Sequence, residues 1–382
     1  MPTLGKVVTA LEKLYDPAWA EPWDAVGLVC GDPEAPVRRV LLAIDPVAAT
    51  VEESVALGAD LLLTHHPLFL RGMHSVATDT YKGRLLHQLI TAGVALYTAH
   101  TNADVAAPGV SDALAARLGL LDTRPLAARP AEPLDKVVTF VPHDAVEPVV
   151  DALASAGAGA VGDYSRCAWL ATGTGTFLPG AGASPAVGRP GVVERVPETR
   201  IEMVLARHLR VPVVRALRAA HPYQEPAYDV LELAPVPNGR GFGRIGELSQ
   251  PLTARALLAK AAEMLPATAS GVRATGDPER VIRTVAVAGG AGDSHLADAA
   301  RAGADAYLTA DLRHHPVSEH TEAAGPALVS AAHWATEHPW LYDAAARLRA
   351  RLDDTVETVV SQLVTDPWSL HLPSVKEPSS AP

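Results

Sequence analysis

Histidine and carboxylate side chains follow three apolar segments of this sequence, each of which predicts a buried strand. Imidazole nitrogens and carboxylate oxygens are common protein ligands of divalent transition metals. In open α/β sheets the functional site lies outside the carboxyl ends of the strands, so side chains that follow separate strands can converge there. The side chains that the sequence places in this way are His65, His66, His100, Asp104, His333 and Glu337.

Five of these side chains supply three imidazoles and two carboxylates: His65, His66, Asp104, His333 and Glu337. A catalytic zinc site takes three protein ligands and a water, so the set is larger than one open site requires. Neighbouring side chains on a strand point to opposite faces, so His65 and His66 serve two adjacent ions more easily than one. His333 and Glu337 would share a face if a helix begins there. We therefore predict a dinuclear centre with two divalent ions per subunit, zinc first, with iron, manganese or cobalt as alternatives.

The alternative is that these histidines are ordinary core or surface residues, as most single histidines are. Two imidazoles without partners at the end of a buried strand would each lose ~1–3 kcal/mol to desolvation. The agreement among three strand ends favours the metal interpretation, in which His100 is the predicted catalytic group, orienting a ligand or transferring protons. His314 and His315 could equally be solvated, supporting or ligating residues. His221 and Glu225 are expected to hold a turn or an interface.

The segments that carry the candidate ligands alternate strands with helices. Strands are predicted at 39–45, 59–64 and 94–99, with helices over 46–57 and 82–92 between them. This alternation is typical of a mainly parallel sheet that is covered by helices on both faces.

A related pattern returns late in the chain. Gly303-Ala-Asp-Ala-Tyr-Leu-Thr309 repeats Gly58-Ala-Asp-Leu-Leu-Leu-Thr64, and a histidine pair follows each copy, four residues further on in the second. We therefore predict two related α/β halves in one sheet system.

The chain has 382 residues. One hydrophobic core rarely grows past roughly 250–300 residues, so more than one core is expected. Between the two halves, the chain follows a β-α-β, β-α-β order that opens at Lys136 and closes with a strand from Tyr228. This order predicts a ferredoxin-like α+β module. The predicted domains are the first half of a metal-binding α/β domain at 1–125, the inserted module at 126–238, the second half at 239–370 and a disordered tail at 371–382.

Composition narrows the classes of function. Apolar residues make up 48% of the chain and charged residues 20%. Such fractions are typical of a globular protein. The net charge of −11 argues against a general nucleic-acid-binding surface. Two cysteines provide neither a disulfide framework nor a CxxC zinc pattern, and no apolar run approaches the ~20 residues of a membrane span. With no signal-peptide core at the N-terminus, we expect a cytoplasmic protein that contacts no membrane.

Several motifs together resemble the proteins known as GTP cyclohydrolase 1 type 2 homologues, the NIF-three-like family. They run in order along nearly the whole chain: Trp23-Asp-Ala-Val-Gly-Leu28, Leu63-Thr-His-His-Pro67, His100-Thr-Asn-Ala-Asp104, His221-Pro-Tyr-Gln-Glu-Pro-Ala-Tyr-Asp229, Gly241-Phe-Gly-Arg-Ile-Gly246, the segment 303–309, and His333 with Glu337. Two positions depart from the family pattern, because Ala25 replaces the usual Asn and Gln224 stands where Glu is common. Neither position is a proposed ligand.

The resemblance implies one NIF-three-like domain built from both halves and interrupted by a PII-like or CutA-like insert. It also implies ring-shaped homohexamers. The implied two-metal site, with the glutamate bridging, comprises the residues matching His65, His66, Asp104, His333 and Glu337.

The expected function is hydrolysis of a small nucleotide-like or heterocyclic substrate by metal-activated water. No recognition motif supports GTP itself, because the glycine-rich segment 172–191 lacks the Lys-Ser/Thr of a phosphate loop and instead predicts a hairpin. The alternative is a non-enzymatic, metal-binding regulatory or chaperone-like ring whose insert senses ligands or contacts partners. The expected partners are further copies of the chain and an unidentified small molecule, and nucleic acid is not expected.

Overall fold

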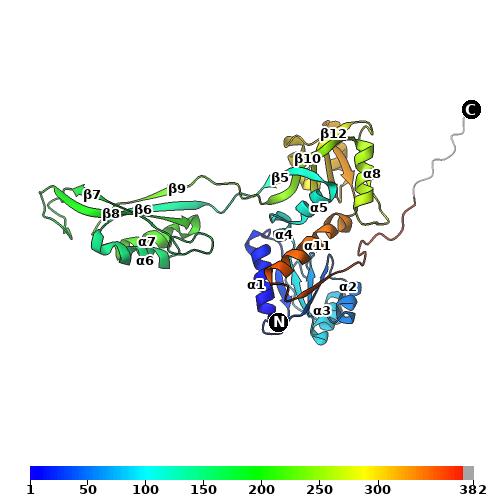
Figure 1. Ribbon diagram of the computed structural model, residues 1–382, viewed down its shortest axis with the longest axis horizontal. Helices are drawn as coiled ribbons and strands as arrows, with labels where there is room; N and C mark the ends of the chain where they lie inside the picture. Colours follow the sequence, from blue (N-terminus) through cyan, green and yellow to red (C-terminus); the bar gives the residue numbers. More distant parts are fainter. Residues whose placement is uncertain (373–382) are drawn as a thin grey trace, which may run out of the picture. The chain divides into compact units, whose positions relative to one another are not determined.

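The computed structural model describes residues 1–372 and divides into two compact units. The first unit combines residues 1–129 with the chain from 239 onward, and the second comprises residues 130–238. Figure 1 shows both units, coloured along the sequence.

The first unit contains a five-stranded sheet with the order β1-β4-β3-β2-β15. Strands β2, β3, β4 and β15 are parallel neighbours, whereas β1 is antiparallel to β4. Every residue of β3 is buried, as expected for a central parallel strand with helices on both faces. The strands are β1 (Gly27–Cys30), β2 (Arg39–Ala43), β3 (Leu61–Thr64), β4 (Ala95–Thr98) and β15 (Glu357–Val360).

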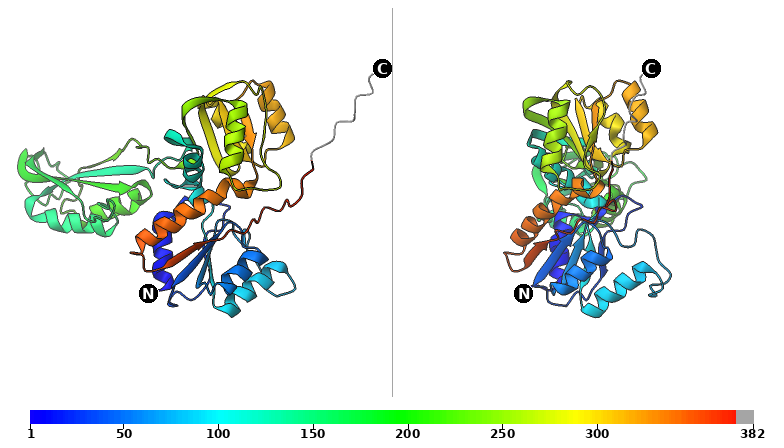
Figure 2. Two further views of the ribbon diagram at one scale, coloured as in Figure 1. Left: turned by 45° about the vertical axis from the view of Figure 1, so that its right-hand side comes forward. Right: turned by 90° about the vertical axis from the view of Figure 1, so that its right-hand side faces the viewer.

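Different helices cover the two faces of this sheet (Figure 2). On one face, α2 (Ala48–Ala56) and α3 (Tyr81–Ala92) form an apolar cluster with Leu62 and Leu96 of the sheet. On the other face, α1 (Leu4–Leu14) and α11 (His333–Arg351) pack against Leu42 and Leu63 within the largest core.

The first unit also contains a six-stranded sheet with the order β11-β14-β13-β12-β10-β5. The expectation of one continuous sheet system is therefore wrong, and the two halves form separate sheets. Strands β12, β13 and β14 are parallel, and the other pairs are antiparallel. The strands are β5 (Leu120–Ala128), β10 (Gly241–Thr253), β11 (Arg273–Ala274), β12 (Val281–Ala291), β13 (Ala306–Ala310) and β14 (Ala327–Ser330).

Five helices accompany the second sheet, and the sequence repeat has a structural counterpart in it. In the first copy, Asp60 accepts two backbone N–H groups at the start of β2, and Asp305 accepts two at the start of β12. The shared Gly-Ala-Asp thus fixes the same strand-to-strand register in both halves. The helices are α4 (Thr101–Val105), α5 (Val110–Leu118), α8 (Ala254–Met264), α9 (Leu296–Arg301) and α10 (His314–Glu322).

The two halves exchange elements. Strand β5 belongs to the first half of the chain but pairs with β10 in the second sheet, whereas β15 closes the first sheet. Helix α11 leaves the second sheet and packs on the first, contacting α1 and α5 on the way. The exchange joins the two sheets in one unit and places the start of α11 between their strand ends.

A buried arginine links the two halves. Arg244 of β10 is 2% exposed, and its guanidinium makes two contacts of 2.7 Å with the carboxylate of Asp112 in α5. It also donates to the carbonyls of Ala106, Gly241 and Gly243. The buried charge is therefore paired and hydrogen-bonded on every side, as a buried guanidinium requires.

The second unit is a four-stranded antiparallel sheet with the order β7-β8-β6-β9. Both helices contribute to one apolar cluster with β6 and β8, including Val137, Val141 and Ile201. The predicted hairpin at 172–191 is in part strand, since β7 includes residues 172–177. The elements are β6 (Leu134–Pro142), α6 (Val146–Ser155), β7 (Trp169–Phe177), β8 (Glu194–Ala206), α7 (Arg210–Ala220) and β9 (Tyr228–Glu232).

The remaining helices are single 3-10 turns: η1 (Pro17–Trp19), η2 (His143–Ala145), η3 (Arg207–Leu209) and η4 (Asp293–His295). After β15, residues 361–372 form neither helix nor strand, but Ser361 donates to Glu53 and Thr365 donates to Asp45. The tail predicted at 371–382 lies outside the described residues from 373 onward. Among the described helices, none has the length and apolar character needed to span a bilayer.

Candidate metal centre

The candidate ligands come from the carboxyl ends of strands in both sheets. His65 and His66 directly follow β3, and His100 lies between β4 and α4. His333 is the first residue of α11, and Glu337 follows one turn later on the same face. The structure therefore brings together side chains that are up to 272 positions apart, from His65 to Glu337.

Glu337 lies in the middle of three imidazoles. Its Oε1 is 2.9 Å from Nε2 of His333 and 3.5 Å from Nε2 of His65, and its Oε2 is 3.3 Å from Nε2 of His66. The Nε2 atoms of His66 and His333 are 3.3 Å apart. The side chains of Glu337 and His65 are 3% and 0% exposed, whereas those of His66 and His333 are 22% and 30% exposed. The cluster is therefore buried on the Glu337 side and partly open on the side of His66 and His333.

The opposite ring nitrogen of each imidazole is held by an oxygen. His65 Nδ1 contacts the carbonyl of Ala99 at 2.8 Å, and His66 Nδ1 contacts Asp45 at 2.7 Å. In the neutral ring, a carboxylate or carbonyl partner fixes Nδ1 as the protonated nitrogen and leaves Nε2 with its lone pair directed inward, the arrangement common among metal-binding histidines.

The same arrangement recurs at the other two imidazoles. His333 Nδ1 donates to Asp311 at 2.7 Å, and His100 Nδ1 donates to Asp24 at 2.8 Å. Asp24 also accepts the backbone N–H of Thr101 at 3.0 Å. Four imidazoles are thus oriented toward one region by groups outside it.

Within the described residues, two groups of side chains have ligand atoms within 4.8 Å of one another. One group comprises His65, His66 and His100, and the other comprises His66, His333 and Glu337. Asp104 belongs to neither group, although its Oδ1 is 3.7 Å from Nε2 of His65. His100 was predicted as the catalytic group, but its position beside His65 and His66 is also compatible with metal binding.

The charges of the cluster strongly shift the pKa values of Glu337, His66 and His333. Burial would raise the pKa of Glu337, but the attraction of His66, His333 and His65 outweighs burial and holds this pKa well below its usual range. For His66, burial opposes protonation, but Glu337 and the hydrogen bond to Asp45 raise the pKa to about 10. Burial likewise opposes protonation of His333, whereas Glu337 and Asp311 raise its pKa to about 11.

Asp104 behaves in the opposite way. Burial raises its pKa, His65 and His100 lower it, and the charge of Glu337 raises it again, with a net upward shift. The pKa values of the two carboxylates are therefore shifted in opposite directions, so Glu337 loses its proton more readily than Asp104 when no cation is bound.

The donor atoms fit divalent metal ions. Within the described residues, His65 Nε2 and Glu337 Oε2 are buried and form no hydrogen bond. Two buried polar atoms without a hydrogen-bond partner in one cluster would be unfavourable in a site without a further ligand. The set of imidazole nitrogens and a carboxylate suits zinc, iron, manganese or cobalt.

A glycine of β12 makes room for the cluster. Gly290 has φ +69°, and a Cβ there would collide with Glu337 Oε1 and lie 3.1 Å from Nε2 of His333. Its backbone N–H donates to Thr336 Oγ1 at 2.9 Å, which ties β12 to the first turn of α11. Only glycine satisfies both the backbone conformation and the close approach.

A cavity of about 640 Å³ adjoins the cluster. His66 and His333 contribute to its wall, so the imidazole side of the cluster is open to a small molecule. Indole rings and one guanidinium complete much of the lining, which includes Arg273, Trp334, Asp366 and Trp368.

Other candidate residues lie away from the cluster. His314 and His315 are exposed at the start of α10, where their rings contact only each other among the aromatic pairs of the described chain. His221 is buried in the second unit and contacts the carbonyl of Phe140 at 3.0 Å. The side chain of Glu225 is 82% exposed and 3.6 Å from Arg218.

The residues that orient the imidazoles were not predicted from the sequence. Asp45 follows β2 by two residues, just as the histidine pair follows β3, so its position after a strand could have identified it. Asp311 occupies the repeat position equivalent to His66, two residues after the shared Thr. Asp24 lies in the Trp-Asp motif, whereas Gly290 carries no local signal, because its role depends on α11 packing against β12.

Fold and site together define a mixed α/β protein with a candidate divalent-metal centre between its two related sheets. The chain belongs to the Duf34/NIF3 (NGG1p interacting factor 3) family, whose model matches residues 2–367. The family resemblance predicted from the sequence motifs is thereby confirmed.

Curated relatives named GTP cyclohydrolase 1 type 2 homolog are similar over almost their entire length. The protein of Mycobacterium tuberculosis is 50% identical over 368 residues, covering 96% of this chain and 97% of the relative. The Mycobacterium leprae protein is 49% identical over 381 residues, covering 99% and 98%. The Streptomyces coelicolor protein is 41% identical over 383 residues, covering 100% and 98%.

Solved structures of similar proteins share the fold. A Bacillus cereus protein related to NIF3 has a TM-score of 0.74 at 36% identity, covering 97% of this chain and 99% of that one. The Staphylococcus aureus protein SA1388 has a TM-score of 0.79 at 25% identity, with the same coverage.

Proposed function

We propose that the chain is a dinuclear metal-dependent hydrolase acting on a small nucleotide-like or heterocyclic substrate. The supporting observation is the position of Glu337, whose two oxygens face different imidazoles: Oε2 faces His66, and Oε1 faces His65 and His333. A carboxylate engaged through both oxygens is the group that bridges two ions. We propose zinc as the metal, with His65, His66, His333, Glu337 and Asp104 as its ligands.

Divalent ions in such a site would polarise the substrate and lower the pKa of a water enough to make it a nucleophile at neutral pH. The chain's own residues have separate tasks. Asp45 and Asp311 hold His66 and His333 in place through their Nδ1 atoms. His100, held by Asp24, keeps its Nε2 at the edge of the cluster and is our candidate for proton transfer to and from the substrate.

The cavity beside His66 and His333 supports the choice of substrate class. Trp334 and Trp368 offer flat apolar surfaces to a heterocyclic ring, and Arg273 offers a cation to an anionic substituent. The names of the relatives include GTP, and a nucleotide-like substrate would be consistent with those names.

The second candidate is a non-enzymatic regulatory or chaperone-like protein that binds metal. The insert supports this candidate. Its strands, numbered from one to four along the chain, lie in the sheet order 2-3-1-4, which is consistent with a ferredoxin-like module. We propose that the insert is a PII-like or CutA-like module, and that the cytoplasmic chain assembles as a homohexameric ring.

Elemental analysis and a turnover screen separate these candidates. The purified chain should contain about two metal equivalents per subunit and should hydrolyse a member of a panel of nucleotides and heterocyclic precursors. Glu337→Ala should lose both metal and turnover. Stoichiometric metal without turnover over the whole panel would favour the regulatory candidate, and a chain that binds no divalent metal would refute both.

A further inference from the structure

The insert contains a cavity of about 620 Å³ on the face of its sheet that the helices leave uncovered. Val137, Val141 and Ile201 pack toward α6 and α7. Side chains alternate along a strand, so Phe140 and Arg200 must point to the opposite face, where both line the cavity. Its size lies within the range of roughly 300–1,000 Å³ typical of small-molecule sites.

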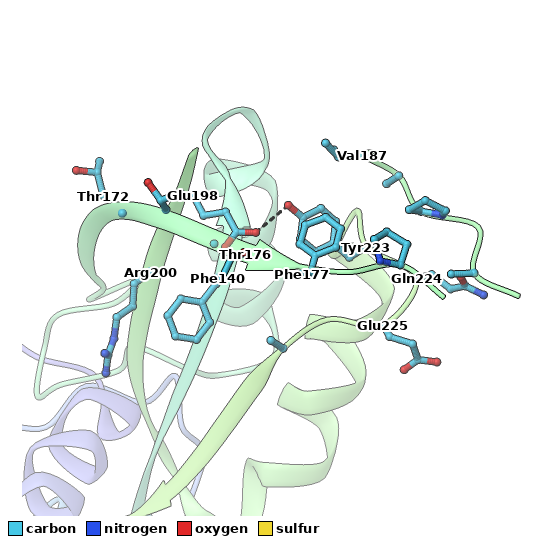
Figure 3. A pocket seen from close by; sticks show the side chains of 18 of the residues that line it. Phe140, Thr172, Thr176, Phe177, Val187, Glu198, Arg200, Tyr223, Gln224 and Glu225 are labelled. Atoms are coloured by element: carbon cyan, nitrogen blue, oxygen red, sulfur yellow. Dashed lines mark hydrogen bonds between the residues drawn. The ribbon is translucent and has the colours of Figure 1, made fainter. Parts of the chain in front are cut away.

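A buried carboxylate lies in this cavity. Glu198 of β8 is 7% exposed, and its Oε1 accepts the hydroxyl of Tyr223 at 2.8 Å (Figure 3). The guanidinium of Arg200, which also lines the cavity, pairs with another carboxylate, since its Nε is 2.9 Å from Oε1 of Glu202. Among the described residues, Glu198 therefore has one neutral hydrogen bond and no cationic partner, although a buried carboxylate ordinarily requires one.

Aromatic rings and a glycine-containing strand form part of the other walls of the cavity. Phe177 and Tyr223 lie with ring centroids 5.9 Å apart on one side, and Phe140 lies on the other (Figure 3). Strand β7 contributes Gly173 and Gly175, and a Cβ at Gly175 would collide with the carboxylate of Glu198. The strand thus keeps a side-chain-free floor beside a charged oxygen.

We propose that this cavity binds a small aromatic or heteroaromatic molecule that carries a protonated nitrogen. The cation would donate to the free oxygen of Glu198, and the ring would rest between Phe177, Tyr223 and Phe140. Anionic ligands are disfavoured beside Glu198, because the lining carries two carboxylates, Glu198 and Glu225, and the Nε of Arg200 is bound to Glu202. The site is formed by the insert alone and does not depend on the proposed metal chemistry.

The test uses the full-length protein and a panel of ring compounds in matched pairs, such as tryptamine and indole-3-propionate. Binding is followed by saturation-transfer NMR and calorimetry at millimolar ligand. Cationic members should bind and their carboxylate counterparts should not. Glu198→Gln should weaken binding of the cations about tenfold, as expected for loss of a charge-assisted hydrogen bond.

Two further variants complete the design. Gly173→Val should block the cavity without disturbing the strand, because no atom lies within 4 Å of a Cβ at this position. Glu147→Gln makes the same chemical change as Glu198→Gln at an exposed position of the insert outside the cavity lining and should leave affinity unchanged.

The proposal is overturned if no cationic member binds, or if bound cations are insensitive to both Glu198→Gln and Gly173→Val. It is also overturned if Gly173→Val changes the oligomeric state measured by light scattering, because the face would then be an interface between copies of the chain. The metal content of each variant, measured in parallel, should be unchanged and shows that the protein is otherwise intact.

Discussion

Nδ1 of His333 donates a hydrogen bond to Oδ2 of Asp311 across 2.7 Å. Asp311 stands at the repeat position that His66 occupies in the first copy, so equivalent positions contribute unlike groups to one cluster. One half supplies an imidazole whose Nε2 faces inward, and the other supplies the carboxylate that orients an imidazole. A cluster built in this way is asymmetric even though its two supporting halves are related.

Glu337→Gln should abolish stoichiometric metal binding. The substitution preserves the shape of the side chain but removes the charge that all three Nε2 atoms face. Metal per chain, measured by elemental analysis after dialysis, should fall below one equivalent. Asp343→Asn removes an exposed carboxylate from the same helix and should retain full metal content; a similar loss in both variants would contradict the assignment.

Gly290→Ala should also lower metal binding, because the new Cβ would displace the carboxylate of Glu337. Gly303→Ala is the matched control, since Gly303 has a similar φ of +77° and no atom within 4 Å of a Cβ. Both variants should lose about 1–2 kcal/mol of stability from left-handed backbone strain, measured by denaturant unfolding. Only Gly290→Ala should lose metal.

Asp45→Asn and Asp311→Asn should each weaken metal binding about 10–100-fold, the usual effect of removing a carboxylate that orients a ligand imidazole. Competition with a chromogenic chelator would measure the change. Asp24→Asn, which releases His100, should lower turnover while metal affinity stays near that of the parent. Equal loss of affinity in all three variants would make His100 a ligand and refute its assignment to proton transfer.

Metal binding should release protons at neutral pH. In the metal-free chain the pKa values of His66 and His333 are about 10 and about 11, so both rings are protonated near pH 7. A ligand imidazole must be neutral, so metal has to displace these protons and apparent affinity should rise with pH. Calorimetry in buffers of different ionisation enthalpy measures how many protons are released. Metal binding without proton release would contradict the raised pKa values of His66 and His333.

The same shifts predict how the stability of the metal-free chain depends on pH. The two raised histidine pKa values stabilise the fold fully below pH 6.5, and this contribution is lost as the pH rises toward 10 to 11. The lowered pKa of Glu337 contributes above pH 4.5 and is lost in acid. Thermal unfolding with chelator should therefore give a higher Tm at about pH 6 than at about pH 9, a difference that saturating zinc should reduce or reverse.

Local patterns predicted much of the cluster. A histidine pair after an apolar strand, and an imidazole and a carboxylate four residues apart, are visible in the sequence because strand ends and helix faces follow from short-range periodicity. The repeat also aligns Asp311 with His66 and could have predicted its place in the cluster. The second histidine pair, His314 and His315, is instead exposed on α10.

Other features depend on contacts that no local pattern encodes. The exchange of β5 and β15 between sheets follows from tertiary pairing, so strand–helix alternation alone suggested one continuous sheet. A glycine is required at position 290 because a Cβ there would collide with Glu337, which is 47 positions away in the sequence. This close approach exists only when α11 packs on β12. The hydrogen bond from His100 to Asp24 spans 76 positions.

The insert leaves and re-enters the first unit through adjacent antiparallel strands, β5 and β10, and the N–H of Arg129 still bonds the carbonyl of Arg240 at 2.9 Å just beyond them. The whole module therefore occupies what would otherwise be the tip of a hairpin. Tips tolerate insertion and excision because neither alters strand register. The insert could therefore be gained, replaced or lost as one unit during evolution. The candidate metal ligands and His100 all lie outside it and would stay in place.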